Sequence, residues 1–258
     1  SIVTMTHNRA YVLGDTLEKI AWEKAGIIKP GVPVVCAPQK PEAFGVLQEV
    51  CRQKGSTLMV AGEDIRWKGE SASLDGQVFQ LDTPGNHYRL WIPLLGKYQL
   101  ENAAVAIGIV ETLIQCGFSI GVSSIEEGLR RVEWPCRLEV LSKSPLLLAD
   151  GAHNPHSAGR LVEAVKALFP GHRILLIVGV SDNKDLEGLT RELDQLSASV
   201  VIATRSRHPR AVRPQRIARA FSPYNDHVHV TDDVSQALEM SRDMAVEGDL
   251  VLVTGSLF

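Results

Sequence analysis

The second half of the sequence alternates short apolar runs with amphipathic segments, and this alternation restricts the fold more than any other feature. Such a pattern is typical of βαβ units, in which helices cover both faces of a mostly parallel sheet. The expected strands are Leu138–Leu141, Leu146–Ala149, Arg173–Val178, Ser199–Ala203, His227–Val230 and Asp249–Thr254, and the expected helices are Pro155–Leu168, Leu186–Gln195, Pro214–Phe221 and Val234–Met244. The sequence therefore predicts a doubly wound, largely parallel α/β domain.

The first half has a more mixed pattern. Residues Ile65–Pro93 alternate polar and apolar side chains, with turn sequences at Asp75-Gly76 and Pro84-Gly85, which indicates antiparallel strands. Around this region we expect strands at Ser1–Met5, Pro33–Ala37 and Leu58–Ala61, and helices at Asp15–Ala25, Pro41–Lys54, Leu100–Gln115 and Ser123–Val132, the last capped by Ser123 or Ser124. The pattern breaks at Trp134-Pro135, so we place a domain boundary near Glu133 and expect domains at 1–133 and 134–258.

Composition and charge narrow the classes of function. Apolar residues make up 45% of the chain and charged residues 22%, as in a globular protein with a substantial core. The net charge of −3 provides no general attraction to nucleic acid. No apolar run approaches the ~20 residues of a membrane span, and no signal peptide is evident. The four cysteines, Cys36, Cys51, Cys116 and Cys136, lack metal-ligand spacing. We expect reduced, buried thiols in a cytoplasmic protein.

The segment Asp150–Pro155 is the most informative candidate site. It follows an apolar strand and precedes a helix, so its polar side chains would cluster where open α/β sheets bind ligands. Asp150 can accept hydrogen bonds from a ribose hydroxyl, His153 can donate to a phosphate or carboxylate, and the helix start adds positive potential. The same pattern also suits Asp150 as a helix cap and His153 as a solvated loop residue.

Two segments of the first half carry weaker signals. Gln99 and Asn102 are three residues apart at an expected helix start, where paired amides can read a nucleobase or hold a phosphate. Capping and helix packing explain the same residues. Lys24, beside Glu23 at the end of a helix, reads by itself as a surface cation that interacts favourably with the helix dipole.

A cluster of arginines follows the strand expected at Ser199–Ala203. Its members are Arg205, Arg207, Arg210, Arg213, Arg216 and Arg219. Guanidinium groups suit phosphates and polyanionic tails, and a solvated face is the alternative interpretation. No aromatic residues are interleaved, which disfavours nucleic acid. The chain contains no GxxxxGK[ST] phosphate loop and no GxGxxG fingerprint.

Taken in order, the motifs of the chain resemble folylpolyglutamate synthase and bifunctional dihydrofolate synthase, within the Mur ligase superfamily. The resemblance covers essentially the whole chain, and its most specific parts are EKAGIIKPG and DGAHNPHS. The matching stretches are Leu13–Gly31, Leu94–Ala106, Trp134–Arg137, Asp150–Leu161, Ser181–Asp185, Arg207–Ala211 and Val253–Phe258.

The resemblance implies a domain layout. It identifies residues 1–133 as the last part of a Mur-ligase-type ATPase domain and 134–258 as the C-terminal domain. The phosphate loop and a glutamate ligand for magnesium would then lie upstream of Ser1. Because the chain also opens within an expected strand, it is interpreted as a fragment.

The resemblance also implies site residues. Asn102, Arg137 and Asp150 match nucleotide contacts, and His153 matches a histidine beside the site. Lys24 matches a lysine that is carboxylated in relatives, and a carbamate can ligate Mg²⁺. The metal-ligand histidine of the family falls at Arg9, so His7, two residues upstream, is the remaining candidate ligand.

The implied activity is ATP-dependent ligation of L-glutamate to a folate or dihydropteroate through an acyl phosphate, by a monomer that binds neither membrane nor nucleic acid. The chain by itself is expected to be inactive. Two alternatives stay open: a non-catalytic nucleotide-binding fragment, and a peptidoglycan-type Mur ligase. ATP turnover separates the first from the ligase, and the identity of the substrate separates the second.

Overall fold

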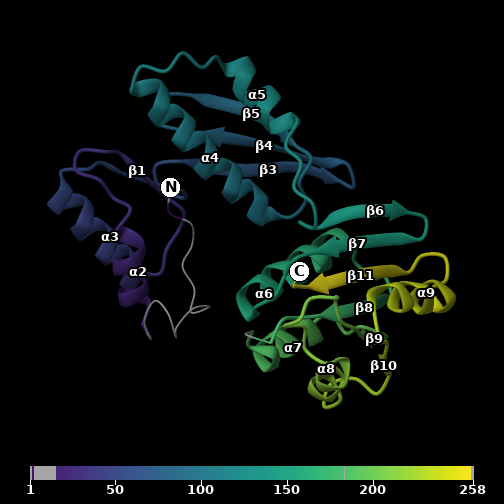
Figure 1. The fold of residues 1–258 in the computed structure, drawn as a ribbon. Helices are drawn as coiled ribbons and strands as arrows, with labels where there is room; N and C mark the ends of the chain where they lie inside the picture. The colour runs from purple at the N-terminus through teal and green to yellow at the C-terminus, as the bar shows by residue number, and fades with distance from the viewer. Residues whose placement is uncertain (1, 3–15, 183, 257–258) are drawn as a thin grey trace. The chain divides into compact units, whose positions relative to one another are not determined.

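The computed structural model describes residues 2, 16–182 and 184–256. The chain divides into two compact units (Figure 1). Unit 1 comprises Ser1–Pro93 and Lys97–Val132, and unit 2 comprises Leu94–Gly96 and Glu133–Phe258. The expected metal ligand His7 and most of the strand expected at Ser1–Met5 lie outside the described residues.

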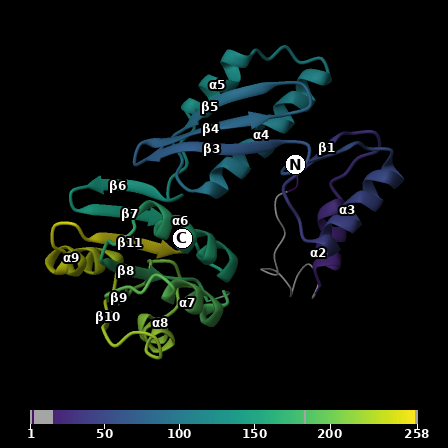
Figure 2. The ribbon, with the colours of Figure 1, turned by 180° about the vertical axis from the view of Figure 1, so that it is seen from behind.

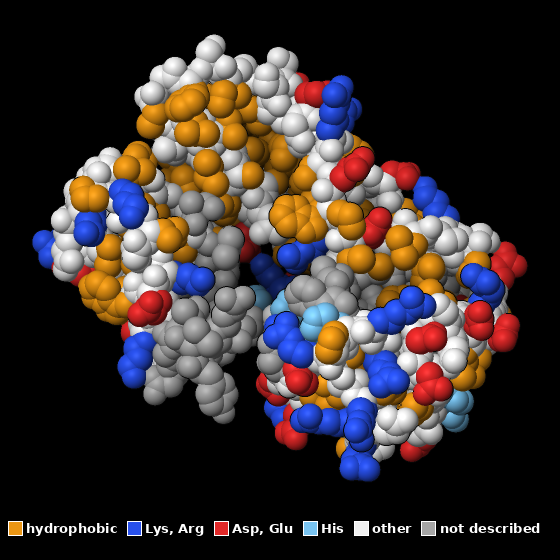
Figure 3. All heavy atoms as spheres, viewed as in Figure 1, with side chains coloured by type: hydrophobic (Ala, Val, Ile, Leu, Met, Phe, Trp, Pro, Cys, Tyr) orange, Lys and Arg blue, Asp and Glu red, His pale blue; other side chains and the backbone are white. Residues whose placement is uncertain are grey.

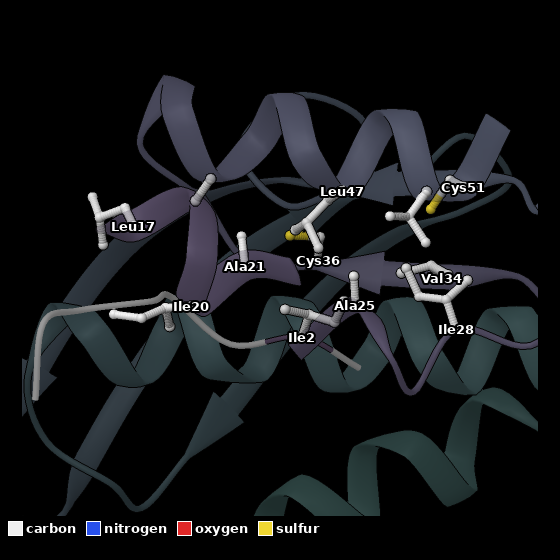
Figure 4. Close-up of a cluster of buried hydrophobic side chains, with 12 residues drawn as sticks. Ile2, Leu17, Ile20, Ala21, Ala25, Ile28, Val34, Cys36, Leu47 and Cys51 are labelled. Atoms are coloured by element: carbon white, nitrogen blue, oxygen red, sulfur yellow. The ribbon is translucent and has the colours of Figure 1, made fainter. Parts of the chain in front are cut away.

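One part of unit 1 is a small parallel sheet with two helices. Strands β1 (Val34–Cys36) and β2 (Leu58–Val60) pair in parallel, and Ile2 extends the sheet through a bridge to Cys36. Helices α2 (Leu17–Ala25) and α3 (Pro41–Lys54) pack against each other. Figure 4 shows the buried side chains between these elements, which include Ile20, Ala25, Val34, Leu47 and Cys51. This apolar cluster fixes the position of α2, which carries Lys24 in its last turn.

The other part of unit 1 is the antiparallel region that the sequence predicts. Strands β3 (Arg66–Ser73), β4 (Gly76–Asp82) and β5 (His87–Ile92) pair in that order. Helix α4 (Lys97–Gln115) begins three residues before the expected Leu100. Helix α5 (Val122–Arg130) is capped by Gly121, so the expected serine cap is wrong. Glycine is an acceptable cap because the backbone carbonyl of Gly121 accepts the N–H groups of the first turn.

A buried carboxylate ties the β4–β5 turn to α4. Glu111 is only 4% exposed, and one of its carboxylate oxygens accepts hydrogen bonds from Tyr88 Oη, Thr83 Oγ1 and Asn86 Nδ2, each at 2.8 Å. Burial, followed by the adjacent Glu111 carboxylate, raises the pKa of Tyr88 well above its usual value. The network holds the hairpin against the helix that carries Asn102.

Unit 2 is a six-stranded sheet in the order β10-β9-β8-β11-β7-β6. Its strands are β6 (Glu139–Lys143), β7 (Leu146–Asp150), β8 (Ile174–Gly179), β9 (Val200–Ala203), β10 (Val228–Val230) and β11 (Leu250–Gly255). All neighbouring strands are parallel except β6 and β7, which form an antiparallel hairpin at one edge. The helices are α6 (Pro155–Leu168), α7 (Leu186–Asp194), α8 (Pro214–Phe221) and α9 (Val234–Met244). The doubly wound, largely parallel fold is thereby confirmed.

Both faces of this sheet are covered. Residues Leu175–Val178 of β8 are all 0% exposed, although successive side chains of a strand point to opposite faces. Leu175 and Ile177 pack with Ala237 of α9 on one face. Helices α6, α7 and α8 form a row of touching neighbours, and α8 packs on β8, β9 and β10. Figure 2 shows the same elements from behind. The parallel strands therefore all end at one edge, which we call the carboxyl edge.

Strands β8 and β11 approach each other closely at the carboxyl edge. Gly255 pairs with Gly179 and has φ 130°, and a Cβ atom there would overlap the Gly179 carbonyl group. Ser256 N donates to Gly179 O and Ser181 N donates to Ser256 Oγ, both at 2.9 Å. The segments that leave the two strands are thus joined. Within the described part of the chain, no helix is both long and apolar enough to cross a membrane.

Candidate functional site

Asp150, the last residue of β7, organises the end of its strand. Asp150 is only 8% exposed. Both of its carboxylate oxygens accept hydrogen bonds from backbone N–H groups. Oδ2 accepts from Leu138 N at 2.9 Å, and Oδ1 accepts from Ala152 N at 2.8 Å. Gly151 N also donates to Cys136 O at 2.8 Å. Asp150 therefore binds the segment 136–138 to the end of β7.

Arg137 is the middle residue of that segment. Its neighbours Cys136 and Leu138 have φ of 57° and 50°, a left-handed conformation that non-glycine residues adopt at a cost of roughly 1–2 kcal/mol each. The hydrogen bond that Leu138 N donates to Asp150 and the burial of the Leu138 side chain offset this cost. The Arg137 guanidinium lies 5.8 Å from the centre of the Trp134 ring, a cation–π distance. The backbone thus presents Arg137 in a defined place beside β7.

His153 has a defined tautomer. Its Nδ1 lies 2.8 Å from Gly151 O, and because a carbonyl oxygen can only accept, Nδ1 carries the proton. In the neutral ring Nε2 is then an acceptor. Burial lowers the pKa of His153, and the nearby charges of Lys184 and Arg137 lower this pKa further, whereas the bond to Gly151 opposes them. The expectation that His153 donates to an anion stays a prediction, because Nε2 can donate only when the ring is protonated.

The start of helix α6 follows the sequence pattern closely. Asn154 is the N-cap, and its side chain accepts from Ser157 N at 2.9 Å. Ser157 Oγ accepts from Asn154 N at 3.3 Å, which completes a capping box with Pro155 in the first turn. Asp150 is consequently not the cap of this helix. The structure brings Arg137, Asp150 and His153 together around this helix start, with Lys184 contributing positive charge.

The other described candidates belong to unit 1. Lys24 is exposed in the last turn of α2. Asn102 is exposed in the first turns of α4, where its Nδ2 donates to Oε1 of the buried Gln99 at 2.9 Å. The expected pairing of the two amides is therefore confirmed. Lys24 and Asn102 lie on different helices.

Metal ligands do not gather in the described residues. Within 2, 16–182 and 184–256, no three His, Cys, Asp or Glu side chains are placed to hold an ion. The described residues therefore do not form a Mg²⁺ site by themselves. A carbamate on Lys24 would supply only one ligand. The four thiols are all free, but Cys116 is exposed and Cys136 is half-buried, so the expectation of four buried cysteines is wrong.

Comparison with known proteins shows what the chain is similar to. Residues 136–257 match the family described as Mur ligase, glutamate ligase domain. The dihydrofolate synthase/folylpolyglutamate synthase of Bacillus subtilis (strain 168) is 29% identical over 260 residues, and the folylpolyglutamate synthase of Lacticaseibacillus casei is 32% identical over 258 residues. The chain is a homologue of the folylpolyglutamate and dihydrofolate synthases.

The similarity to these synthases extends along the chain. The two relatives are matched over 100% and 99% of the chain, but the chain spans only 60% and 58% of their lengths. The structure of Escherichia coli FolC in complex with DHPP and ADP has a TM-score of 0.85 at 25% identity, and the match covers 99% of this chain and 58% of that one. This folylpolyglutamate synthase homologue thus corresponds to about three fifths of its relatives.

Two features of this synthase homologue escaped sequence reasoning. The charge of Lys184 lowers the pKa of His153, although 31 positions separate the two residues in the sequence. Thr204, directly after β9, is 2% exposed, and its Oγ1 is a buried side-chain atom without a hydrogen-bond partner in the described part of the chain. The polar sequence Ser181–Asp185 after an apolar strand could have indicated Lys184. Nothing local distinguishes Thr204 from an ordinary strand end.

Proposed function

We propose that the protein to which this chain belongs is an ATP-dependent ligase that adds L-glutamate to a folate, and that residues 1–133 and 134–258 are the end of its ATPase domain and its C-terminal domain. Similarity to dihydrofolate and folylpolyglutamate synthases along essentially the entire chain is the observation that carries this proposal. We further propose dihydropteroate as a second acceptor, a monomeric state and a cytoplasmic location.

In this proposal, unit 2 binds the phosphates and ribose of ATP. The cationic side chains of Arg137 and Lys184 lie near His153 and favour an anionic ligand at the start of α6. Asp150 keeps Arg137 in place through the backbone and is itself proposed to accept a ribose hydroxyl. Asn102 of unit 1 is proposed to contact the adenine edge or a phosphate.

The proposed reaction has two steps. The terminal carboxylate of the folate attacks the γ-phosphorus of ATP, which forms an acyl phosphate and releases ADP. The amine of glutamate then attacks the acyl carbon, so that a C–N bond forms, the C–O bond to phosphate breaks and inorganic phosphate leaves. The amine loses one proton in this step, and His153 Nε2 is the proposed acceptor because Nδ1 is bound to Gly151 O, which leaves Nε2 as the acceptor of the neutral ring.

Lys24 is proposed as a carbamate that helps to hold Mg²⁺, which would neutralise phosphate charge, with His7 as a further ligand. The described residues give this assignment no completed donor set, so we assign no reaction step to the metal. Hydrolysis or loss of the carbamate would restore an exposed ammonium group on α2.

The test is an ATP- and glutamate-dependent ligation assay with tetrahydrofolate and dihydropteroate as acceptors. The protein of natural length and the 258-residue chain are assayed side by side. Product formation by the longer protein supports the proposal, and a folded longer protein that ligates neither acceptor would refute it. A UDP-sugar acceptor serves as the comparison for a peptidoglycan-type Mur ligase.

For the 258 residues alone, a non-catalytic nucleotide-binding role is the second candidate. The printed sequence contains no GxxxxGK[ST] motif, so the chain lacks the backbone cradle and lysine that such a loop gives to the β- and γ-phosphates. We expect the isolated chain to bind nucleotide more weakly than the longer protein and to form no product.

A further inference from the structure

Unit 2 contains a segment in which arginines are the only permanently charged residues. Between Gln195 and Asn225 the sequence contains no aspartate, glutamate or lysine, whereas the chain as a whole has 27 basic and 30 acidic residues. The cations of this segment are Arg205, Arg207, Arg210, Arg213, Arg216 and Arg219, which we call the arginine strip. The chain as a whole has a net charge of −3, so this local excess of positive charge favours a binding partner that is negatively charged.

All six guanidinium-bearing residues of the strip are exposed. Helix α8 buries Pro214, Ile217 and Phe221, so Arg216 and Arg219 lie on its solvent side. In the residues that the structure describes, no carboxylate forms an ion pair with a member of the strip, and Arg205 Nε donates to a backbone oxygen, that of Asp232. Figure 3 shows blue Lys and Arg side chains over the region of α8. Among the described residues, therefore, no ion pair offsets the positive charge of the strip.

The strip is held at the carboxyl edge by its backbone. Asp182 N donates to Arg210 O, and Val212 N donates to Val180 O, both at 2.8 Å. Ser181 and Ala211 form an antiparallel bridge between the same segments. The loop after β9 is therefore fastened to the segment that follows β8. The arginines of this loop thus have a fixed support at the carboxyl edge, where Asp150 also ends its strand, and Arg216 and Arg219 follow on α8.

The proposed reaction produces a ligand whose charge suits this surface. Each added glutamate contributes one carboxylate, so a γ-glutamyl tail becomes a flexible polyanion with regularly repeated carboxylates. Guanidinium groups bind carboxylates with two parallel hydrogen bonds. Single exposed pairs contribute little, and several together give useful affinity. The strip contains no Phe, Tyr or Trp between Arg205 and Arg219 on which bases could stack, which disfavours single-stranded nucleic acid.

We propose that the arginine strip binds the γ-glutamyl tail of the folate substrate or product. This proposal rests on the proposed ligase function. It predicts that affinity for the acceptor rises with the number of glutamates already attached. The strip then sets the preference for tail length and takes no part in the bond-making step.

The test uses the protein of natural length and compares pteroylmonoglutamate with pteroylpentaglutamate acceptors in their tetrahydro forms. The test variant is Arg207→Gln/Arg210→Gln/Arg216→Gln. The control variant, Lys166→Gln/Arg191→Gln/Arg242→Gln, removes the same number of exposed charges from unit 2 outside the strip. Thermal unfolding of both variants checks that the fold is retained.

The expected result is a rise of about tenfold in KM for the pentaglutamate in the test variant, since each exposed charge pair contributes roughly a factor of two. The KM for the monoglutamate, kcat and the control variant should change less than twofold. Equal effects on both tail lengths, or no effect on either, would overturn the proposal.

Direct binding separates the strip from the ligase function. Isothermal titration of the 258-residue chain with free penta-γ-glutamate should show salt-sensitive binding that the test variant loses and the control variant keeps. If the longer protein ligates no folate, the proposed function fails, whereas this titration still measures the strip. Binding of single-stranded RNA that is equal to or tighter than that of penta-γ-glutamate at the same salt concentration would assign the strip to nucleic acid and reject the proposal.

Discussion

Oδ2 of Asp150 accepts a hydrogen bond from Leu138 N at 2.9 Å, between residues that lie 12 positions apart in the sequence. The bond joins the end of β7 to the chain just before β6. Because Arg137 directly precedes Leu138, the hydrogen bond to the Asp150 carboxylate also fixes the backbone from which the Arg137 side chain extends. An acidic residue thus acts through the backbone on the position of a cation that is proposed to bind the ligand.

We predict that Asp150→Asn and Asp150→Ala weaken this junction in graded fashion. An amide has a single acceptor oxygen, so asparagine can replace one of the two backbone bonds and alanine neither. The free energy of unfolding should fall by about 1–3 kcal/mol for the alanine variant, and less for asparagine. Hydrogen–deuterium exchange should accelerate at the amides of Leu138 and Ala152. The exposed substitution Asp243→Asn is the control, and unchanged exchange at Leu138 would contradict the role of Asp150.

His153 should titrate below the ordinary histidine pKa of about 6.5. Burial and the nearby cations disfavour the imidazolium, so Lys184→Gln should raise the pKa of His153 towards its ordinary value. An NMR titration of the imidazole resonance measures both values, and Lys166→Gln serves as the control. A pKa of His153 that is unaffected by Lys184→Gln would show that the charge of Lys184 does not reach the ring.

The same shift has a consequence for stability. The unfolded chain protonates His153 at a higher pH than the folded chain does. The contribution of His153 to the free energy of unfolding is therefore complete above the ordinary pKa and is lost as the pH falls towards the lower pKa of the folded state. His153→Gln should flatten this part of the curve of stability against pH. An unchanged curve would contradict the lowered pKa.

The Glu111 network should be strongly coupled. Glu111→Ala leaves the buried Tyr88 hydroxyl without its acceptor, at a cost of roughly 1–3 kcal/mol for that group alone. Tyr88→Phe in the same chain removes the stranded hydroxyl, so the double variant should be less destabilised than the sum of the two single variants. Urea denaturation of the four proteins gives the coupling energy. Simple additivity would show that the bond between Tyr88 and Glu111 adds nothing to stability.

The cysteines should differ in reactivity. Burial raises the pKa of the Cys36 thiol to about 11, so little thiolate forms at pH 8. Cys116 is exposed at the end of α4. Iodoacetamide should therefore label Cys116 in the folded protein and Cys36 only after denaturation, as peptide mass spectrometry can determine. Rapid labelling of Cys36 in the folded chain would show that its part of unit 1 opens readily.

Local sequence signals predicted much of the fold. Helices α6 and α8 begin at the expected prolines, Pro155 and Pro214, and end at the expected residues, because proline at the first helical position and the apolar spacing act within one segment. The start of α5 was predicted wrongly because two serines suggested a cap, whereas the backbone of Gly121 provides it. Patterns of this kind report on neighbours along the chain.

The candidate site was predicted only in part. The motif around Asp150 and His153 correctly indicated where a strand ends and a helix begins, whereas its role in binding stays a prediction. The partners of Asp150 could not be predicted, because the left-handed backbone at Cys136 and Leu138 opposes their local preference and depends on bonds formed across the sheet edge. Lys24 and Asn102 stay predictions that rest on resemblance, and His7 falls outside the described residues.

The contact between Gly179 and Gly255 has a mechanical consequence. Two parallel strands meet there without side chains, and the segments that follow them share the bond from Ser181 N to Ser256 Oγ. A shift of one segment must carry the other with it. The segment after β8 is also bonded to the loop after β9, which bears part of the arginine strip. We expect a molecule bound to one of the segments after β8, β9 or β11 to restrict the motion of the other two. We therefore expect the segments that follow β8, β9 and β11 to move together at the carboxyl edge of unit 2.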